Sequence, residues 1–111
     1  MNDFLLIYST FASELEAEKV ARVLLSEGLI ACVNLIPGGR SLYWWNSKIE
    51  SSNEVYALMK TTALMAPRAQ SRLLDLHPYK TPCIMTLEPH QVNGAYAQWL
   101  KSSIFLPGVQ E

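Results

Sequence analysis

The chain has 111 residues, half of them hydrophobic, so we expect one domain over residues 1–111 with one core. Nine lysines and arginines balance ten aspartates and glutamates without a run of like charge. This balance excludes the basic surface that nucleic acid or an anionic membrane requires. The apolar runs are far shorter than the roughly 18 residues of a membrane span, and no basic signal region is present. We therefore expect a cytoplasmic protein.

A strand and a helix are predicted first. Phe4–Tyr8 is a short continuous apolar run, typical of a central strand. Ser13, with Glu16 three residues later, forms a capping-box pattern, and apolar residues then recur at helical spacing. Gly28 suits the left-handed position that ends a helix. The first helix is therefore predicted between Ser13 and Gly28.

A long hairpin is predicted next. Ile30–Trp45 is rich in β-branched and aromatic residues and is interrupted by Pro37–Gly39. Asn46–Ser47 supplies a turn, and Ile49–Thr62 runs back. An arm of about fifteen residues would reach on the order of 50 Å, whereas a compact domain of this length has a radius of gyration of about 13 Å. The hairpin must bend or protrude, and Pro37–Gly39 is the predicted bend.

The hairpin tip carries three aromatic side chains, Tyr43, Trp44 and Trp45. A protruding tip would expose several hundred Å² of aromatic surface, more than a soluble monomer usually leaves open. We therefore expect an oligomer whose subunits associate through this hairpin.

The second half of the chain predicts helix, strand and helix. Pro67 suits the first turn of a helix that stops at His77–Pro78. Cys83–Leu87 is predicted as the fourth strand, and Asn93 begins a last helix. We expect the tail from Phe105 to be weakly ordered. The predicted apolar face of the last helix consists of Tyr96, Trp99 and Leu100.

The predicted order is strand, helix, strand, strand, helix, strand, followed by an extra C-terminal helix. This order is the α+β, ferredoxin-like split βαβ arrangement, in which helices cover one face of a four-stranded antiparallel sheet. The other face would need a cover too, and association of subunits would provide it. The fold hosts many unrelated activities, so function has to be argued from residues.

His77–Cys83 is the densest cluster of unusual residues. Two prolines fix the backbone between an imidazole and a thiol, a pair that suits Cu(I) or Zn. The alternative is that His77 ends the helix, where a cation is favoured, and that Cys83 is a small strand residue. Cys32 lies in an apolar strand, where a free cysteine is usually part of the core.

Glu54 and Lys60 leave two interpretations open. Both are surface charges worth little, or both face a cleft between subunits, where they would pair or bind a small polar ligand. His90 is predicted as a solvated loop residue. The sequence has no GxSxG, HExxH, phosphate-binding glycine loop or CxxC pair, so we predict no enzyme and no structural disulfide.

Several stretches, in order along the chain, carry a family likeness that extends from Phe4 to about Ile104. They are Leu29–Pro37, Ser41–Trp45 with Lys48–Ile49 and Glu54, Leu58–Thr62, His77–Pro82, and Tyr96 with Trp99–Leu100. Together they resemble the CutA divalent-cation-tolerance proteins. The resemblance implies a ferredoxin-like subunit and a tight homotrimer built like the PII signalling proteins. It also implies an association with copper or another divalent metal, with no organic cofactor and no established reaction.

The resemblance also carries over individual positions. Cys32 matches the family's strand cysteine and His77 its motif histidine, so with Cys83 they form the predicted metal-binding set. The residues predicted to line or buttress the cleft between subunits are Tyr43, Trp45, Glu54, Lys60, Tyr79 and Trp99.

Three positions depart from the family pattern. Ser13 stands where the family often has Asp and is an equivalent cap. Ser47 stands where it usually has Gly, a mild cost if the turn needs a positive φ. Cys83 stands where it usually has Glu, and a soft thiol in place of a hard carboxylate changes either a metal preference or a polar network. Our hypothesis is that His77 and Cys83 bind soft ions; the alternative is a pocket that binds no metal.

The favoured interpretation is a trimeric metal-binding or metal-response protein without catalysis. The alternative is a PII-like regulatory module that binds a small anionic ligand in the cleft through Lys60 and backbone donors. An acylphosphatase-type enzyme is disfavoured because Arg68 and Arg72 lie on the second predicted helix, and no arginine-bearing phosphate loop follows the first strand.

Overall fold

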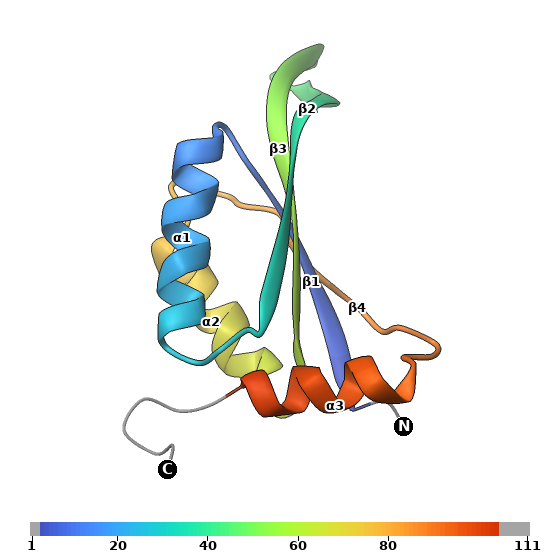
Figure 1. Ribbon diagram of the computed structural model, residues 1–111. Helices are drawn as coiled ribbons and strands as arrows, with labels where there is room; N and C mark the ends of the chain where they lie inside the picture. The colour runs from blue at the N-terminus through green and yellow to red at the C-terminus, as the bar shows by residue number, and fades with distance from the viewer. Residues whose placement is uncertain (1–2, 105–111) are drawn as a thin grey trace.

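The computed structural model describes residues 3–104, and the predicted tail from Phe105 lies outside them. The strands are β1 (Phe4–Phe11), β2 (Cys32–Trp45), β3 (Lys48–Thr62) and β4 (Ile84–Leu87). The helices are α1 (Glu14–Ser26), α2 (Ala66–Leu76) and α3 (Gly94–Ser103). Their order along the chain confirms the predicted ferredoxin-like arrangement with an added C-terminal helix (Figure 1).

The four strands form one antiparallel sheet in the order β2-β3-β1-β4. Helices α1 and α2 cover one face, and α3 crosses the end of the sheet away from the hairpin tip (Figure 1). The core lies between the sheet and α1 and α2. Its most buried large side chains include Ile7, Phe11, Leu24, Met59 and Leu73.

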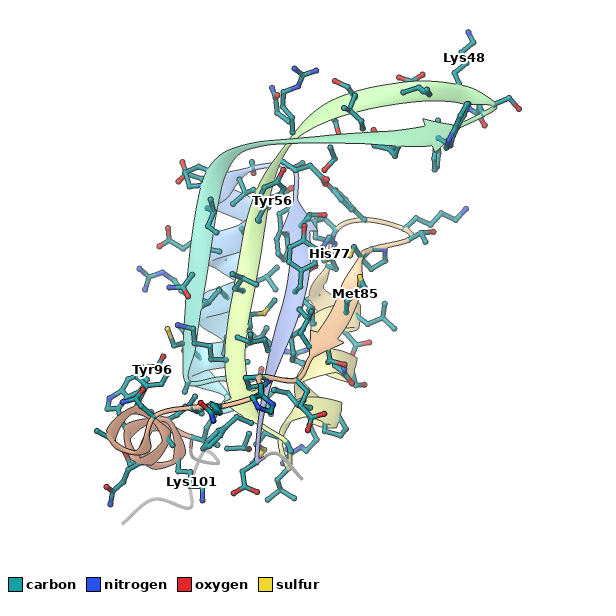
Figure 2. All side chains as sticks on the ribbon, turned by 90° about the vertical axis from the view of Figure 1, so that its right-hand side faces the viewer. Lys48, Tyr56, His77, Met85, Tyr96 and Lys101 are labelled. Carbon is teal, nitrogen blue, oxygen red and sulfur yellow. The ribbon has the colours of Figure 1, made fainter. Side chains whose placement is uncertain are left out.

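We call the other side of the sheet the open face, because neither α1 nor α2 covers it. Residues directly opposite each other on neighbouring strands point to the same side of a sheet. The register therefore defines the open face by these residues: Leu6, Tyr8, Cys32, Asn34, Ile36, Tyr56, Leu58, Lys60, Met85 and Leu87. Figure 2 views the molecule from this side.

Helix α1 begins and ends at the predicted residues. The Glu16 N–H donates to Ser13 Oγ at 3.2 Å, which satisfies one of the free donors at the start of the helix. Gly28 follows the helix with φ of 72°, a conformation that costs glycine little. The capping prediction is therefore confirmed at both ends.

A β-bulge bends the hairpin at the predicted place. Ile36 lies opposite Tyr56, but Gly39 lies opposite Glu54, so Pro37 and Gly38 together face a single residue of β3. One extra residue in a strand reverses the sides to which all later side chains point. Before the bulge, even-numbered residues of β2 point to the open face; after it, Ser41, Tyr43 and Trp45 continue that face. Figure 2 shows that the upper part of the hairpin bends away from the direction of the lower strands.

Tyr56 closes the bulge. Its hydroxyl donates to the Arg40 carbonyl at 2.9 Å and accepts the Arg40 N–H at 3.0 Å. The ring lies so near Gly39 that a Cβ there would stand 2.7 Å from Tyr56 Cε2 and 2.8 Å from the Glu54 carbonyl oxygen. Glycine is therefore required at residue 39 by close approach.

The tip of the hairpin is apolar and exposed. Leu42, Trp44 and Ile49 lie on one side of it and are 71%, 72% and 64% exposed. The molecule measures 51 × 30 × 22 Å, and the hairpin forms one end of the long axis. The predicted exposed aromatic tip is confirmed for the subunit.

The two-residue turn at the tip yields a stability prediction. Asn46 and Ser47 both have positive φ, 49° and 65°, as a type I′ turn requires. Ser47→Gly should raise the free energy of unfolding by about 0.5 kcal/mol, because relief of roughly 1 kcal/mol of left-handed strain exceeds the entropy cost of glycine. Urea unfolding at fixed protein concentration measures this. Ser47→Ala, the control, should give no such gain; equal midpoints for the two variants would contradict the assignment.

Candidate functional site

The candidate site is centred on Glu54, which is half-buried on the side of β3 that continues the open face. Ser41 Oγ donates to Glu54 Oε1 at 2.6 Å, and Tyr79 Oη donates to Oε2 at 2.7 Å. The bulge places Ser41 on this side, and the segment after α2 brings in Tyr79. Two short hydrogen bonds to an ionised acceptor fix the carboxylate's orientation. Glu54 is therefore an oriented group rather than a loose surface charge.

The groups around Glu54 are acids whose pKa values are raised. Burial raises the pKa of Tyr79 far above its usual value, and the hydrogen bond to Glu54 adds to the effect. Burial, followed by the Glu54 charge, also raises the pKa of the Cys83 thiol. Burial and the nearby acidic groups raise that of Tyr8. These three groups are therefore uncharged at neutral pH.

His77 is 7% exposed, and both of its ring nitrogens are hydrogen-bonded. Nδ1 accepts the Tyr79 N–H at 3.1 Å, so the ring proton is on Nε2, which donates to the Thr10 carbonyl at 2.8 Å. The ring also stacks on Phe11 with centroids 4.4 Å apart. Burial lowers the pKa of His77, so it is neutral. Within the subunit, the imidazole has no free lone pair for a metal.

The alternative that His77 caps α2 is correct only in part. Its backbone N–H bonds to the Leu73 carbonyl at 2.9 Å and ends the helix. Its ring, however, bonds to Thr10 on β1 instead of the last carbonyls of α2, and it is not a cation. The physical reason is burial, which disfavours a charged imidazole.

The two cysteines are free, partly exposed and far apart. Cys32 begins β2 and Cys83 precedes β4, and these are the two outer strands. Three strand spacings of about 4.8 Å separate them by about 14 Å or more. One subunit therefore does not bring His77, Cys83 and Cys32 together, and no group of three His, Cys, Asp or Glu suited to a metal exists among residues 3–104.

The prediction that Cys32 is a core residue is wrong for the subunit. Cys32 lies opposite Lys60 on the open face. The alternation of β2 instead turns Val33 and Leu35 toward the core, where both pack against it. Cys83 lies at the edge of the sheet, and its carbonyl accepts a hydrogen bond from the buried Ser9 hydroxyl at 2.6 Å.

The predicted cleft residues form separate groups in one subunit. Near the bulge lie Glu54, Tyr79 and Tyr43, whose hydroxyl lies 3.3 Å from Ser52 Oγ, and Trp45 lies at the tip. At the other end, Lys60 Nζ lies 5.4 Å from the centroid of the Tyr96 ring.

Trp99 belongs to this lower group. Its ring packs on Tyr96 with centroids 5.4 Å apart, and it is 46% exposed. Glu54 and Lys60 are six residue steps apart on β3, which is about 20 Å of strand. A single subunit therefore does not bring the upper and lower groups together. Figure 2 shows Tyr56 and Tyr96 at these two levels.

Sequence reasoning missed Ser41, Tyr8 and Tyr56 as site residues. Ser41 reaches Glu54 only because the bulge reverses the faces of β2. Tyr8 and Tyr56 pack together with ring centroids 6.4 Å apart on the open face. The signal available in the sequence was Pro37–Gly39, which marks the bulge without saying which side chains it turns toward Glu54.

Comparisons with known proteins cover nearly the whole described chain. A family model described as CutA1 divalent ion tolerance protein matches residues 5–103. The divalent-cation tolerance protein CutA of Pyrococcus horikoshii is 42% identical over 96 residues, 86% of this chain and 93% of that protein. The one from Thermotoga maritima is 41% identical over 100 residues, 90% of this chain and 98% of that protein.

Solved structures that match the chain carry the same description as these relatives. The crystal structure of the divalent ion tolerance protein CutA1 from Ehrlichia chaffeensis superposes with a TM-score of 0.91 at 31% identity, covering 96% of this chain and 99% of that one. The structure titled periplasmic divalent cation tolerance protein CutA from Archaeoglobus fulgidus gives 0.86 at 32%, covering 90% and 97%. None of the helices among residues 3–104 is long and apolar enough to cross a membrane.

The buried neutral His77 predicts a pH dependence of stability. Its pKa is lowered in the folded protein, so below the unfolded-state value of 6.5 the unfolded chain binds a proton that the folded chain resists. The free energy of unfolding of the metal-free protein should therefore fall as the pH drops below about 6.5, by at most about 1.4 kcal/mol per pH unit from this residue. His77→Gln should remove that slope.

The exposed His90, the second of the two histidines, provides the matched control. His90→Gln should keep the slope in urea unfolding measured between pH 7 and 5 with a chelator present. An unchanged slope in His77→Gln would show that His77 is not the buried neutral group described above.

Proposed function

The chain belongs to the CutA1 family of divalent ion tolerance proteins, and from this premise we propose that it is a cytoplasmic homotrimer that binds copper or another divalent metal. In this proposal the protein takes part in the cell's response to that metal and catalyses no reaction. The support is the family match over residues 5–103 and the description of its relatives as divalent-cation tolerance proteins.

The observation that carries the trimer is the open face. It carries apolar side chains that no helix within residues 3–104 covers over most of its length, and Met85 on it is 57% exposed. The exposed tip adds Leu42, Trp44 and Ile49. Exposed apolar surface of this extent marks an association surface in soluble proteins. Other copies of the chain, which present the same surfaces, are the proposed cover.

The proposed metal site must agree with the positions of the two thiols in the subunit. One subunit does not fit a metal with the predicted set, because Cys32 and Cys83 lie at opposite edges of the sheet and the lone pair of His77 is used. The two edges of different copies are free to approach each other. We therefore place the metal between copies, with Cys32 of one and Cys83 of another as soft ligands suited to Cu(I) or Zn.

Metal binding at Cys83 is expected to depend on pH. A cysteine binds metal as the thiolate, and burial together with the Glu54 charge raises the pKa of this thiol. Uptake therefore releases a proton from Cys83. The apparent affinity should rise with pH across the neutral range, by up to about tenfold per unit for each thiol that loses a proton.

The cytoplasmic location is supported by the two free cysteines, which suit a reducing compartment. The Archaeoglobus fulgidus relative is described as periplasmic, so the compartment is a separate question from the family. Cell fractionation with an antibody to this chain distinguishes the two locations.

A second candidate function is supported by Lys60. None of the ion pairs among residues 3–104 includes it, and its ammonium group lies over the Tyr96 ring on the open face. A PII-like module that binds a small anionic ligand in the cleft would use this cation. A nucleotide-specific rise in unfolding temperature would support this candidate, and no shift across a nucleotide panel would count against it.

The metal proposal is tested by native mass spectrometry of the reduced protein with and without Cu(I) and Zn(II). We expect a complex of three 12.5 kDa chains that takes up a stoichiometric number of ions. Uptake should be lost in Cys83→Ser and in Cys32→Ser, while His77→Gln should keep it because that ring is not a free ligand. A trimer that takes up no metal, or one whose Cu(I) affinity is equal in Cys83→Ser, would contradict the metal site.

A further inference from the structure

Glu54 is an uncompensated charge in a half-buried place. The ion pairs found among residues 3–104 join Arg22 to Glu18, Arg72 to Glu27 and Lys101 to Asp3, and none involves Glu54. The nearest basic residue of β2, Arg40, donates to Ser51 Oγ at 3.0 Å on the other side of the hairpin. The bulge therefore turns the hydroxyl of Ser41 toward Glu54 and the guanidinium away from it.

Among residues 3–104, the groups that hydrogen-bond to Glu54 or interact with it electrostatically are all uncharged. Tyr79 and Ser41 give it hydroxyl protons, and Tyr8, Cys83 and His77 lie near enough to interact with it electrostatically. The phenols and the thiol are protonated and neutral, and the imidazole is neutral. Glu16 also acts electrostatically on Tyr79 and His77, so the charges in and beside the group are negative. A half-buried anion of this kind is stabilised when a cation completes it.

Aromatic rings dominate the surroundings of the carboxylate. Tyr56 follows Glu54 on the same side of β3, and its ring contacts that of Tyr8 at 6.4 Å between centroids. Tyr79 reaches Glu54 from the segment after α2. Aromatic faces beside a carboxylate attract an organic cation through their quadrupoles. Each carboxylate oxygen keeps a further lone pair after accepting one hydroxyl proton.

A divalent metal fits this arrangement less well than an ammonium group. Hard divalent cations take about six or more oxygen ligands, usually from several carboxylates. Glu54 is the carboxylate that accepts the hydroxyl protons here, and Glu16 acts on Tyr79 and His77 only electrostatically. No group of three His, Cys, Asp or Glu suited to a metal is found among residues 3–104. The hydroxyl protons of Ser41 and Tyr79 point toward Glu54. A primary ammonium group needs only one anionic acceptor and can lie beside uncharged aromatic rings.

We propose that Glu54, walled by Tyr8, Tyr56 and Tyr79, is a binding site for a primary ammonium group. The ammonium comes either from a free alkylamine or from Lys60 of a second copy. The subunit's own Lys60 lies about 20 Å along the same strand, beyond the reach of its side chain. The site goes beyond the proposed metal function, and only its Lys60 source rests on the proposed association of copies.

The test is thermal unfolding and native mass spectrometry of the full chain with n-butylamine hydrochloride, an analogue of the lysine side chain. Sodium chloride at equal ionic strength is the reference. If a free amine is the ligand, butylamine raises the unfolding midpoint of the wild type above the reference. That rise is lost in Glu54→Gln and kept in Lys60→Met and in Glu50→Gln, a matched loss of charge nearer the tip.

If Lys60 of a second copy is the ligand, the wild type shows no butylamine-specific shift. Lys60→Met and Glu54→Gln then each weaken the oligomer by at least about tenfold, and the double variant is no weaker than either. In Lys60→Met no lysine fills the Glu54 site, so butylamine should raise the unfolding midpoint of this variant. Glu50→Gln assembles like the wild type.

The proposal is overturned if butylamine stabilises neither the wild type nor Lys60→Met and both single variants assemble normally. It is also overturned if Mg²⁺ or Zn²⁺ stabilises the protein through Glu54 while butylamine does not. A wild type that is monomeric in native mass spectrometry would contradict the proposed trimer, yet the free-amine titration would still decide whether the ammonium site exists.

Discussion

The two hydrogen bonds between the Tyr56 hydroxyl and the backbone of Arg40 hold the bulge on which the rest of the hairpin depends. A bulge leaves its extra residue outside the ladder, and unpaired backbone groups are costly when they lose water. Here one phenol bonds to both backbone groups of Arg40, just after the bulge, and Gly39 leaves room for its ring. The Arg40 N–H and carbonyl therefore keep hydrogen-bond partners where the chain bends over the open face.

The electrostatics of the site follow from this bend. Because the bulge shifts β2 by one residue, Ser41 and Tyr43 lie on the same side as Glu54, whereas Arg40 lies on the other. The carboxylate is therefore oriented by hydroxyl groups and not neutralised by its neighbours. Its negative field then helps to keep the Tyr79 phenol and the Cys83 thiol protonated. The fold presents an apolar face with the oriented anion Glu54 near the hairpin and the cation Lys60 near α3.

The sequence was sufficient for the elements and their order, because helix caps, periodicity and turn residues act locally. Ser13 and Gly28 bound α1, and Pro37–Gly39 marks the bend. The site was only partly predictable, because its geometry depends on contacts distant in sequence. Tyr56 reaches Arg40 across the hairpin, and the lone pair of His77 is used by a backbone N–H that spacing alone cannot locate. Which side chains of β2 face the core could not be assigned without its register against β3, so Cys32 was predicted in the core.

The most direct test of the account is amide hydrogen exchange at Arg40 in the wild type and in Tyr56→Phe. The account predicts that the Arg40 amide is protected in the wild type, because the Tyr56 hydroxyl accepts its proton. In Tyr56→Phe this amide should exchange much faster while amides of β1 stay protected. Equal protection of Arg40 in both proteins would show that the phenol does not hold the bulge, and the orientation of Glu54 would then need another cause.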